Sequence, residues 1–151
     1  MPTRPNIVTS TLDRGPFLLD TMVLSEGFKV RPDPAAYRWL NAYRHQDTAY
    51  LSVITIGEVA RGVRRLEMTE KRRPDRYIDW LEATVVVYDK RVLPLTIGTA
   101  RRWGQLSHDL RNTNPDLLIA ATALEHDLTI VTRNVRHIEP TGVKLLNPYE
   151  T

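Results

Sequence analysis

The sequence predicts an α/β sandwich in which helices pack against a mostly parallel sheet. Short apolar segments alternate with helical patterns from Pro16 onward, and strands separated by helices need the crossover connections of parallel sheets. The length of 151 residues suits one domain with a substantial core. We therefore expect a single domain over residues 16–151. Residues 1–15 contain two prolines and no periodicity, and they predict a flexible leader or extension.

Short apolar segments with the character of buried strands recur along the chain. They are residues 17–20, 49–52, 91–94, 128–131 and 143–146. In parallel sheets, ligands gather at the carboxyl ends of the strands. Asp20 closes the first segment, and Thr132 and Asn134 follow the fourth, so these side chains are expected at the same end of the sheet.

Periodic apolar patterns between the strands predict helices. One begins at Pro34, one follows Ser52, one runs from Pro74 toward Thr84 before a hydrophobic run at residues 85–88, and one spans about 97–111. The helix after Ser52 has its apolar residues on one side: Ile56, Val59, Ala60, Val63 and Leu66. Asn114, Pro115 and Asp116 supply the N-cap, the first-turn proline and the early acid of a further helix. Its apolar face is formed by Leu117, Ala120, Ala121 and Leu124.

The composition limits the kind of site that the chain can carry. With no cysteine, it has no thiol nucleophile, disulfide scaffold or zinc site with sulfur ligands, and its four histidines are scattered. Any metal is therefore expected to be a hard cation held by oxygen. No apolar run approaches the ~20 residues that a spanning helix needs, and no export signal is recognisable. We expect a soluble, cytoplasmic protein without membrane contact.

Three carboxylates are candidate site residues, and each also has an ordinary structural interpretation. Asp20 stands where a strand stops and faces a cleft, or it caps the next short helix. Glu58 lies roughly 130° from the apolar stripe of its helix, and it is either a site residue or a surface partner of Arg61 or Arg65. Asp116 lies in a first helical turn, where a carboxylate interacts well with the helix dipole whatever its function.

Taken together, these acids predict a metal-dependent phosphodiesterase. Carboxylates from separate strand and helix ends can converge on one Mg²⁺, which prefers few protein carboxylates and several waters. A basic segment at residues 61–76 holds seven basic groups against three acidic ones, and a polyanion is attracted to such a strip. We expect RNA contacts from Arg64, Arg65, Arg72 and Arg73, with a solvated helix face as the alternative.

The same residues resemble a known family. FLLDTMVLSE near the start, SVITIGEVARGV in the middle and NPDLLIAATALEHDLTIVTRN near the end are similar to PIN-domain nucleases of the VapC toxin type. The aspartate-threonine start, the glutamate after the second strand and the D-x-x-I-A-A-T-A segment occur in the family's order and spacing. The resemblance covers Phe17 to about Tyr149, which is nearly all of the chain after the leader.

The resemblance implies a three-layer α/β/α sandwich and a ribonuclease that uses Mg²⁺ or Mn²⁺. It assigns the metal to Asp20 and Asp116 and makes Glu58 the third acid, with Thr132 and Asn134 in supporting positions. It also implies inhibition by a VapB-type antitoxin encoded alongside, whose tail lies in the nuclease cleft. Family members are usually homodimers, and such complexes commonly repress their own operon, so operator DNA would be contacted only through the antitoxin.

The chain departs from the family pattern at three positions. Met22 replaces an asparagine, Asn134 stands where some relatives have a fourth acid, and His137 stands where relatives often have Asp or Glu. A second hypothesis is therefore a catalytically weak or inactive subunit that binds RNA or the antitoxin. A third is an RNA-processing nuclease without an antitoxin, which the reading frame upstream of the gene would distinguish from a toxin.

Overall fold

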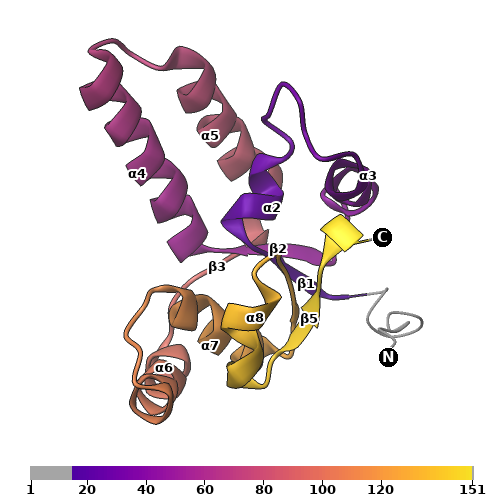
Figure 1. Ribbon diagram of the computed structural model, residues 1–151, viewed down its shortest axis with the longest axis vertical. Coiled ribbons are helices and arrows are strands. Elements are labelled where there is room, and N and C mark those ends of the chain that lie inside the picture. Colours follow the sequence, from indigo (N-terminus) through magenta and orange to yellow (C-terminus); the bar gives the residue numbers. More distant parts are fainter. Residues whose placement is uncertain (1–14, 151) are drawn as a thin grey trace.

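The computed structural model describes residues 15–150 and shows one parallel sheet with helices on both faces (Figure 1). Within this range the strand order is β3-β2-β1-β4-β5, and every neighbouring pair is parallel. The strands are β1 (Phe17–Leu19), β2 (Ala49–Ser52), β3 (Val92–Leu93), β4 (Thr129–Val131) and β5 (Lys144–Leu146). The predicted α/β fold is confirmed. The predicted leader lies outside the described residues, except for Gly15.

Seven helices flank the sheet in the described part of the chain. They are α2 (Thr21–Ser25), α3 (Pro34–Tyr43), α4 (Val53–Glu70), α5 (Asp75–Tyr88), α6 (Ile97–Leu110), α7 (Asp116–His126) and α8 (Val135–Ile138). Periodic patterns predicted the five long helices, and a short helix after Asp20 entered only as the structural alternative for that residue. A helix of one turn such as α8 is too short to show a period, and it was not predicted. None of these helices combines the length and the apolar character that crossing a membrane requires.

The alternation of side chains along β1 creates the three layers. Phe17 and Leu19 face one core cluster, which includes residues of α2 and α3, whereas Leu18 faces a second cluster, which includes residues of α7 and α8. All three side chains are fully buried. Because successive side chains of a strand point to opposite faces, a central strand without polar positions requires a helical layer on each side.

Helix α7 is buried on almost every side. Its alanines, Ala120, Ala121 and Ala123, have no exposed surface, and Ile119 and Thr122 are also buried. Small side chains let a helix lie close to its neighbours, so α7 is held between the sheet and α6. A site residue at the first turn of α7 therefore stands on a rigid element.

Helices α4 and α5 form a hairpin that extends away from the sheet (Figure 1). The predicted apolar stripe of α4 is wrong at Ala60, which is exposed, whereas Thr55, Val59 and Val63 are buried. The buried face is therefore narrower than the sequence predicts. The hydrophobic run at residues 85–88 continues α5, with its three valines exposed and Tyr88 buried.

Candidate active site

Asp20 stands at the carboxyl end of β1, where the chain turns into α2. Its backbone N–H donates to the carbonyl of Val131 at 3.0 Å and so extends the pairing of β1 with β4. Asp20 occupies the N-cap position of α2 with an extended backbone, but its side chain makes no capping hydrogen bond. The Oδ2 atom instead accepts from the Thr132 hydroxyl at 2.7 Å. The carboxylate is thus held by the residue that follows the neighbouring strand β4.

Thr132 and Asn134 follow β4 and support Asp20. Thr132 is buried, and its N–H donates to the carbonyl of Leu146 at 3.0 Å, which holds the end of β4 against β5. Its Oγ1 donates to Asp20 and accepts from the backbone N–H of Asn134 at 3.0 Å. The hydroxyl therefore acts as donor and as acceptor at the same time, and these two hydrogen bonds fix its orientation. The structure brings both supporting residues of the sequence analysis next to Asp20.

Glu58 is half-buried on α4 and is held by a residue that the sequence analysis did not single out. The Thr21 hydroxyl donates to Glu58 Oε1, which ties the first turn of α2 to α4. Within residues 15–150, Glu58 forms no ion pair with Arg61 or Arg65, so the alternative of a paired surface glutamate is not what the structure shows. The sequence signal for Thr21 was its place directly after Asp20, in the aspartate-threonine start of the family resemblance.

Asp116 begins α7 in the way that the sequence predicts. The Asn114 side chain accepts from the backbone N–H of Asp116 at 2.9 Å, and Pro115 already has helical dihedral angles. Asn114 thus caps the helix and Pro115 occupies its first position. The predicted helix start is confirmed, and it leaves the Asp116 carboxylate free of the capping interaction.

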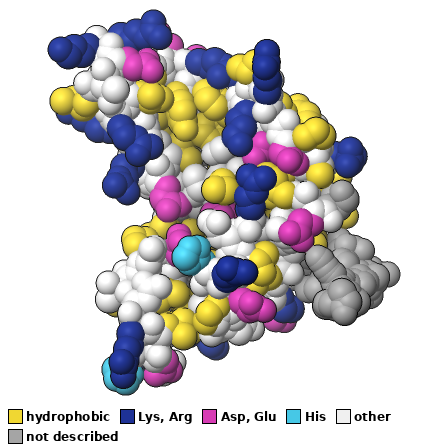
Figure 2. Space-filling view, viewed as in Figure 1, with side chains coloured by type: hydrophobic (Ala, Val, Ile, Leu, Met, Phe, Trp, Pro, Cys, Tyr) yellow, Lys and Arg dark blue, Asp and Glu magenta, His cyan; other side chains and the backbone are white. Residues whose placement is uncertain are grey.

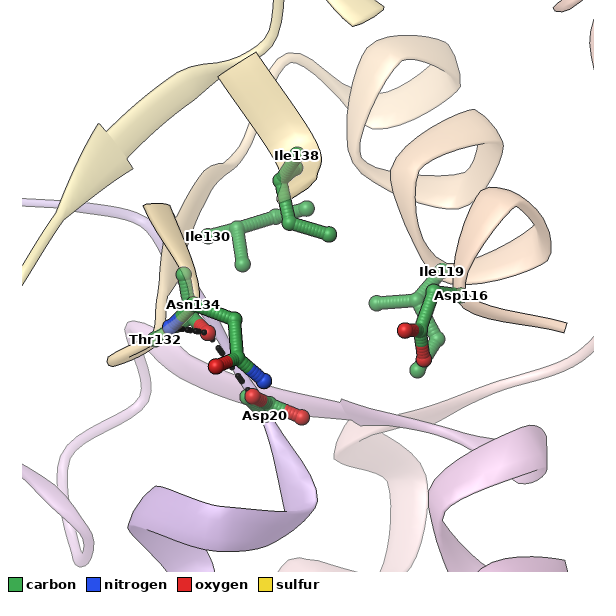
Figure 3. Close-up of a pocket in the computed structure, with 7 residues that line it drawn as sticks. All are labelled: Asp20, Asp116, Ile119, Ile130, Thr132, Asn134 and Ile138. Atoms are coloured by element: carbon green, nitrogen blue, oxygen red, sulfur yellow. Dashed lines mark hydrogen bonds between the residues drawn. The ribbon is translucent and has the colours of Figure 1, made fainter. Parts of the chain in front are cut away.

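Asp20 and Asp116 line one pocket from opposite sides, with the Asn134 side chain beside Asp20 (Figure 3). Thr132 completes the polar part of the lining. The rest of the lining is apolar and consists of Ile119, Ile130 and Ile138. Carboxylates from β1 and α7, nearly a hundred residues apart in sequence, therefore meet at the carboxyl end of the sheet, where parallel folds place their ligands.

The pKa values of Asp20 and Glu58 are both raised above their ordinary values. Burial is the largest cause of the raised pKa of Asp20, and the negative charge of Asp116 adds to it, while the Thr132 hydrogen bond works in the opposite direction. The pKa of Glu58 is raised by burial and by the charges of Asp116 and Asp20, and it is lowered by the Thr21 hydrogen bond and by Arg61. The three carboxylates therefore lie within electrostatic reach of one another.

A divalent cation fits this donor set. Asp20 and Asp116 are half-buried carboxylates of like charge, and a cation between them would remove their repulsion. Within residues 15–150 no three His, Asp or Glu side chains form a complete metal-binding group. Two carboxylates are enough for Mg²⁺, which usually keeps several waters and takes one or two carboxylates from the protein.

Comparison with known proteins identifies the family. The family model of the PIN domain matches residues 17–142. The chain belongs to the PIN domain family. This PIN domain is 32% identical over 139 residues to VapC ribonuclease Y4jK of Sinorhizobium fredii, which covers 88% of the chain and 97% of that relative. It is 30% identical to Toxin FitB of Neisseria gonorrhoeae over 137 residues, 87% of the chain and 97% of the relative.

Solved structures of similar proteins support the three-layer arrangement. FitAcB of Neisseria gonorrhoeae superposes with a TM-score of 0.75 at 28% identity, over 89% of this PIN domain's chain and 99% of that chain. DNA-bound VapBC of Salmonella typhimurium has a TM-score of 0.68 at 25% identity, over 87% of this chain and 97% of that one. The three-layer fold expected from the resemblance is confirmed.

The basic strip of this PIN domain lies on the α4–α5 hairpin, and Lys and Arg side chains gather at its tip (Figure 2). Arg64, Arg72 and Arg73 are exposed and form ion pairs with Glu67, Glu70 and Asp75, respectively. None of the strip's residues lines the pocket between Asp20 and Asp116. With a rise of 1.5 Å per residue, Arg65 is about 10 Å beyond Glu58 along α4. The part of the strip from Arg65 onward is therefore separate from the carboxylate pocket, whereas Arg61, at its near end, is close enough to lower the pKa of Glu58.

Proposed function

We propose that this PIN domain is the endoribonuclease toxin of a toxin–antitoxin pair and hydrolyses RNA phosphodiester bonds with Mg²⁺ or Mn²⁺. The observation that carries the proposal is the pocket with Asp20 and Asp116 on opposite sides and Glu58 in electrostatic contact with both. Similarity to relatives named VapC ribonuclease and Toxin FitB supports it, as does the presence of VapBC and FitAB complexes among the similar structures.

Asp20 and Asp116 are the residues that would hold the cation. When bound, a divalent cation stabilises the developing negative charge of phosphoryl transfer and makes water more acidic. The Thr132 hydrogen bond keeps the Asp20 carboxylate in one orientation, and the burial of α7 does the same for the backbone of Asp116. The positions of both oxygen donors are thus set before a ligand arrives, which is what an electrostatic site requires.

Glu58 is suited to act on the attacking water. Its Oε1 is engaged by Thr21, so Oε2 remains to orient a water and accept its proton. In the proposed reaction, the water oxygen forms a bond to phosphorus and the bond from phosphorus to the leaving ribose oxygen breaks. The leaving oxygen takes up a proton from solvent, and Glu58 afterwards releases to solvent the proton that it accepted. The Asn134 amide at the pocket can donate to a phosphate oxygen without adding negative charge.

Cleavage of a mixed RNA pool by the purified protein tests the proposal. The wild type is compared in Mg²⁺, in Mn²⁺ and in EDTA with Asp20→Asn and with the matched control Asp109→Asn, an exposed aspartate on α6. We expect cleavage only with a metal, a loss of at least about 100-fold in Asp20→Asn, and wild-type rates in the control. Cleavage in EDTA, or a folded Asp20→Asn protein with full activity, would refute the proposal.

Absence of cleavage under every condition would favour the second hypothesis, a binding subunit. In that case the protein would bind RNA with salt-sensitive affinity and without turnover. The departures at Met22 and Asn134 are the residues to restore first, as Met22→Asn and Asn134→Asp. Activity gained by either change would show that the site is weakened rather than misassigned.

The proposed partner is a VapB-type antitoxin, and the toxin itself is proposed to be a homodimer that reaches operator DNA only through that antitoxin. The support is similarity to complexes described as VapBC or FitAB, some of them bound to DNA. Co-expression with the short reading frame adjacent to the gene should yield a stable complex and relieve growth arrest. Light scattering of the toxin alone measures its oligomeric state, and a monomer would contradict the dimer.

The hairpin arginines are proposed to bind RNA at a distance from the cut. Charge reversal of Arg64, Arg65, Arg72 and Arg73 together should weaken the salt dependence of RNA binding. The slope of the logarithm of the binding constant against the logarithm of the salt concentration should become shallower by about 0.7 for each phosphate that the variant no longer binds. An unchanged slope would mean that the strip is a solvated face, its arginines neutralised by their own acidic neighbours.

A further inference from the structure

Arg133 is an exposed arginine between two residues of the carboxylate pocket. It follows Thr132, whose hydroxyl holds Asp20, and precedes Asn134, which lines the pocket. Its guanidinium carbon lies 4.3 Å from the centre of the Tyr149 ring. Among the residues that the structure describes, it forms no ion pair with a carboxylate, in contrast to Arg73 on the hairpin. Its charge is therefore not neutralised by a neighbour.

The Tyr149 ring is a fixed platform for this guanidinium. Its hydroxyl donates to Glu26 Oε2 at 2.7 Å and also lies 3.3 Å from the carbonyl oxygen of Met22. Glu26 has no exposed surface, and it is itself held by the ammonium group of Lys29 and the N–H of Asp33, each at 2.9 Å. The ring thus joins the end of the chain to α2, the helix that begins beside Asp20.

A guanidinium stacked on an aromatic ring keeps its N–H donors available at the edge of its plane. Arginine uses that planar fork to bind phosphate oxygens in pairs, and stacking limits the rotamers that it would otherwise lose on binding. The nearby pocket is lined by acids, which repel the backbone of an incoming RNA. A fixed positive charge one residue from Thr132 would offset that repulsion.

We propose that Arg133 binds an RNA backbone phosphate adjacent to the bond that is cut, and that Tyr149 is the positioning residue that holds its guanidinium. This inference rests on the proposed ribonuclease function. It assigns to the loop after β4 a substrate-binding role in addition to the support that Thr132 gives to Asp20. A flanking phosphate is bound equally in the ground state and in the transition state, so this interaction acts on RNA affinity rather than on the chemical step.

RNA binding in an Asp116→Asn background separates affinity from cleavage. Fluorescent single-stranded RNA of random sequence is titrated over a range of salt concentrations, with Arg133→Gln added to this background. We expect the dissociation constant to rise at least about fivefold at low salt and the salt slope to fall by about 0.7, the value for one phosphate fewer bound. Arg133→Lys keeps the charge, so it should retain the slope and recover part of the affinity.

The matched control is Arg101→Gln on α6. Arg101 is also exposed and has no carboxylate partner within residues 15–150. Its neighbour Arg102 pairs with Glu125, which is nine residues beyond Asp116 and so about 13 Å along α7 from the pocket. Its replacement removes the same charge far from the site and should leave the slope unchanged.

Tyr149 variants test the platform. Tyr149→Phe keeps the ring and should bind RNA within about twofold of the parent, whereas Tyr149→Leu removes the aromatic face and should weaken binding as Arg133→Gln does. In the cleaving enzyme, Arg133→Gln should raise KM and leave kcat within about twofold. A variant that had merely lost its fold would lose kcat and its cooperative unfolding transition instead.

The outcomes distinguish this inference from the proposed function. If the wild type cleaves RNA and Arg133→Gln matches it in affinity, slope and KM, the role of Arg133 is wrong and the function stands. If Arg133→Gln weakens only the complex with the antitoxin, the residue serves the partner protein and the inference is again wrong. If the wild type neither cleaves nor binds RNA, both proposals fail together.

Discussion

Two helices of this PIN domain begin with the same dipeptide, but the aspartates of the two dipeptides lie in opposite environments. Pro74-Asp75 begins α5 at the tip of the hairpin, and Pro115-Asp116 begins α7 at the end of the sheet. Asp75 is 73% exposed and pairs with Arg73 at 2.8 Å. Asp116 faces Asp20 across the pocket and raises its pKa. One aspartate has its counterion two residues away in sequence, and the other faces a second carboxylate across the pocket.

The comparison teaches that the helix-start signal does not reveal function. An acid in the first turn interacts favourably with the helix dipole in both places, so local physics explains both residues equally well. They differ in their long-range neighbours. Where the fold brings like-charged acids to one pocket, their repulsion costs stability and indicates a ligand.

The largest expected effect comes from replacing the two aspartates in turn. Asp116→Asn should reduce metal-dependent RNA cleavage by at least about 100-fold, because it removes the negative charge of one of the two carboxylates proposed to hold the cation. Asp75→Asn changes the same atoms at the same helical position, and it should cleave within about twofold of the wild type. Rates on one RNA pool, with the folded state checked by circular dichroism, measure both. Equal losses in the two variants would remove the distinction between the helices.

Metal binding should appear in stability as well as in activity. At a Mg²⁺ concentration ten times the dissociation constant, binding to the native state adds about 1.4 kcal/mol to the free energy of unfolding. We expect this gain in the wild type and in Asp75→Asn, and its loss in Asp116→Asn. Thermal unfolding with Mg²⁺ and with EDTA measures it. A gain that survives in Asp116→Asn would place the cation elsewhere.

The pH dependence of stability sharpens the contrast between acids that repel one another and acids that are paired. The pKa of Asp20 is raised in the folded state, so its ionised form is destabilising at neutral pH, and this cost disappears as the pH falls toward the ordinary value of 3.8. In EDTA, Asp20→Asn should therefore be more stable than the wild type at pH 7, and this advantage should shrink as the pH falls toward 4.

Glu26 provides a control whose effect on stability at neutral pH is opposite to that of Asp20. Hydrogen bonds from Lys29, Asp33 and Tyr149 lower its pKa below 4.5 despite its burial, so it stabilises the fold above that pH and loses the contribution on acidification. Glu26→Gln should be less stable than the wild type at pH 7, and this deficit should shrink below pH 4.5. Denaturant unfolding at several pH values measures both variants. The same sign for both would contradict the assigned electrostatics.

The smallest effect is expected at the hairpin. The Arg73–Asp75 ion pair is exposed on both sides, and such pairs contribute about 0.2–1 kcal/mol. Asp75→Asn should lower the free energy of unfolding by no more than about 0.5 kcal/mol, and salt should abolish the difference. Denaturant unfolding at low and at high salt is the measurement. A larger loss would mean that the hairpin tip contributes to the stability of the whole domain.

Much of the fold could be predicted because the signals are local. The strand at β4 and the helix start at Asn114 follow from short apolar runs and capping chemistry, and both are confirmed within a residue or two. Strand β3 covers only residues 92–93 of the predicted 91–94, since Pro94 has no N–H to donate to a neighbouring strand. The exposed Ala60 escaped prediction because periodicity does not say how far a neighbouring helix reaches along α4.

The sequence by itself determined the order of strands and helices, the parallel sheet, and the placement of Asp20 at the end of a strand. Only the tertiary structure decided which groups meet: Thr21 with Glu58, Thr132 with Asp20, and Tyr149 with Arg133. The reason is the distance along the sequence over which each effect acts. Propensity, capping and periodicity act over a few residues, whereas Thr132 and Asp20 are separated by 112 positions and are joined by the pairing of β1 with β4.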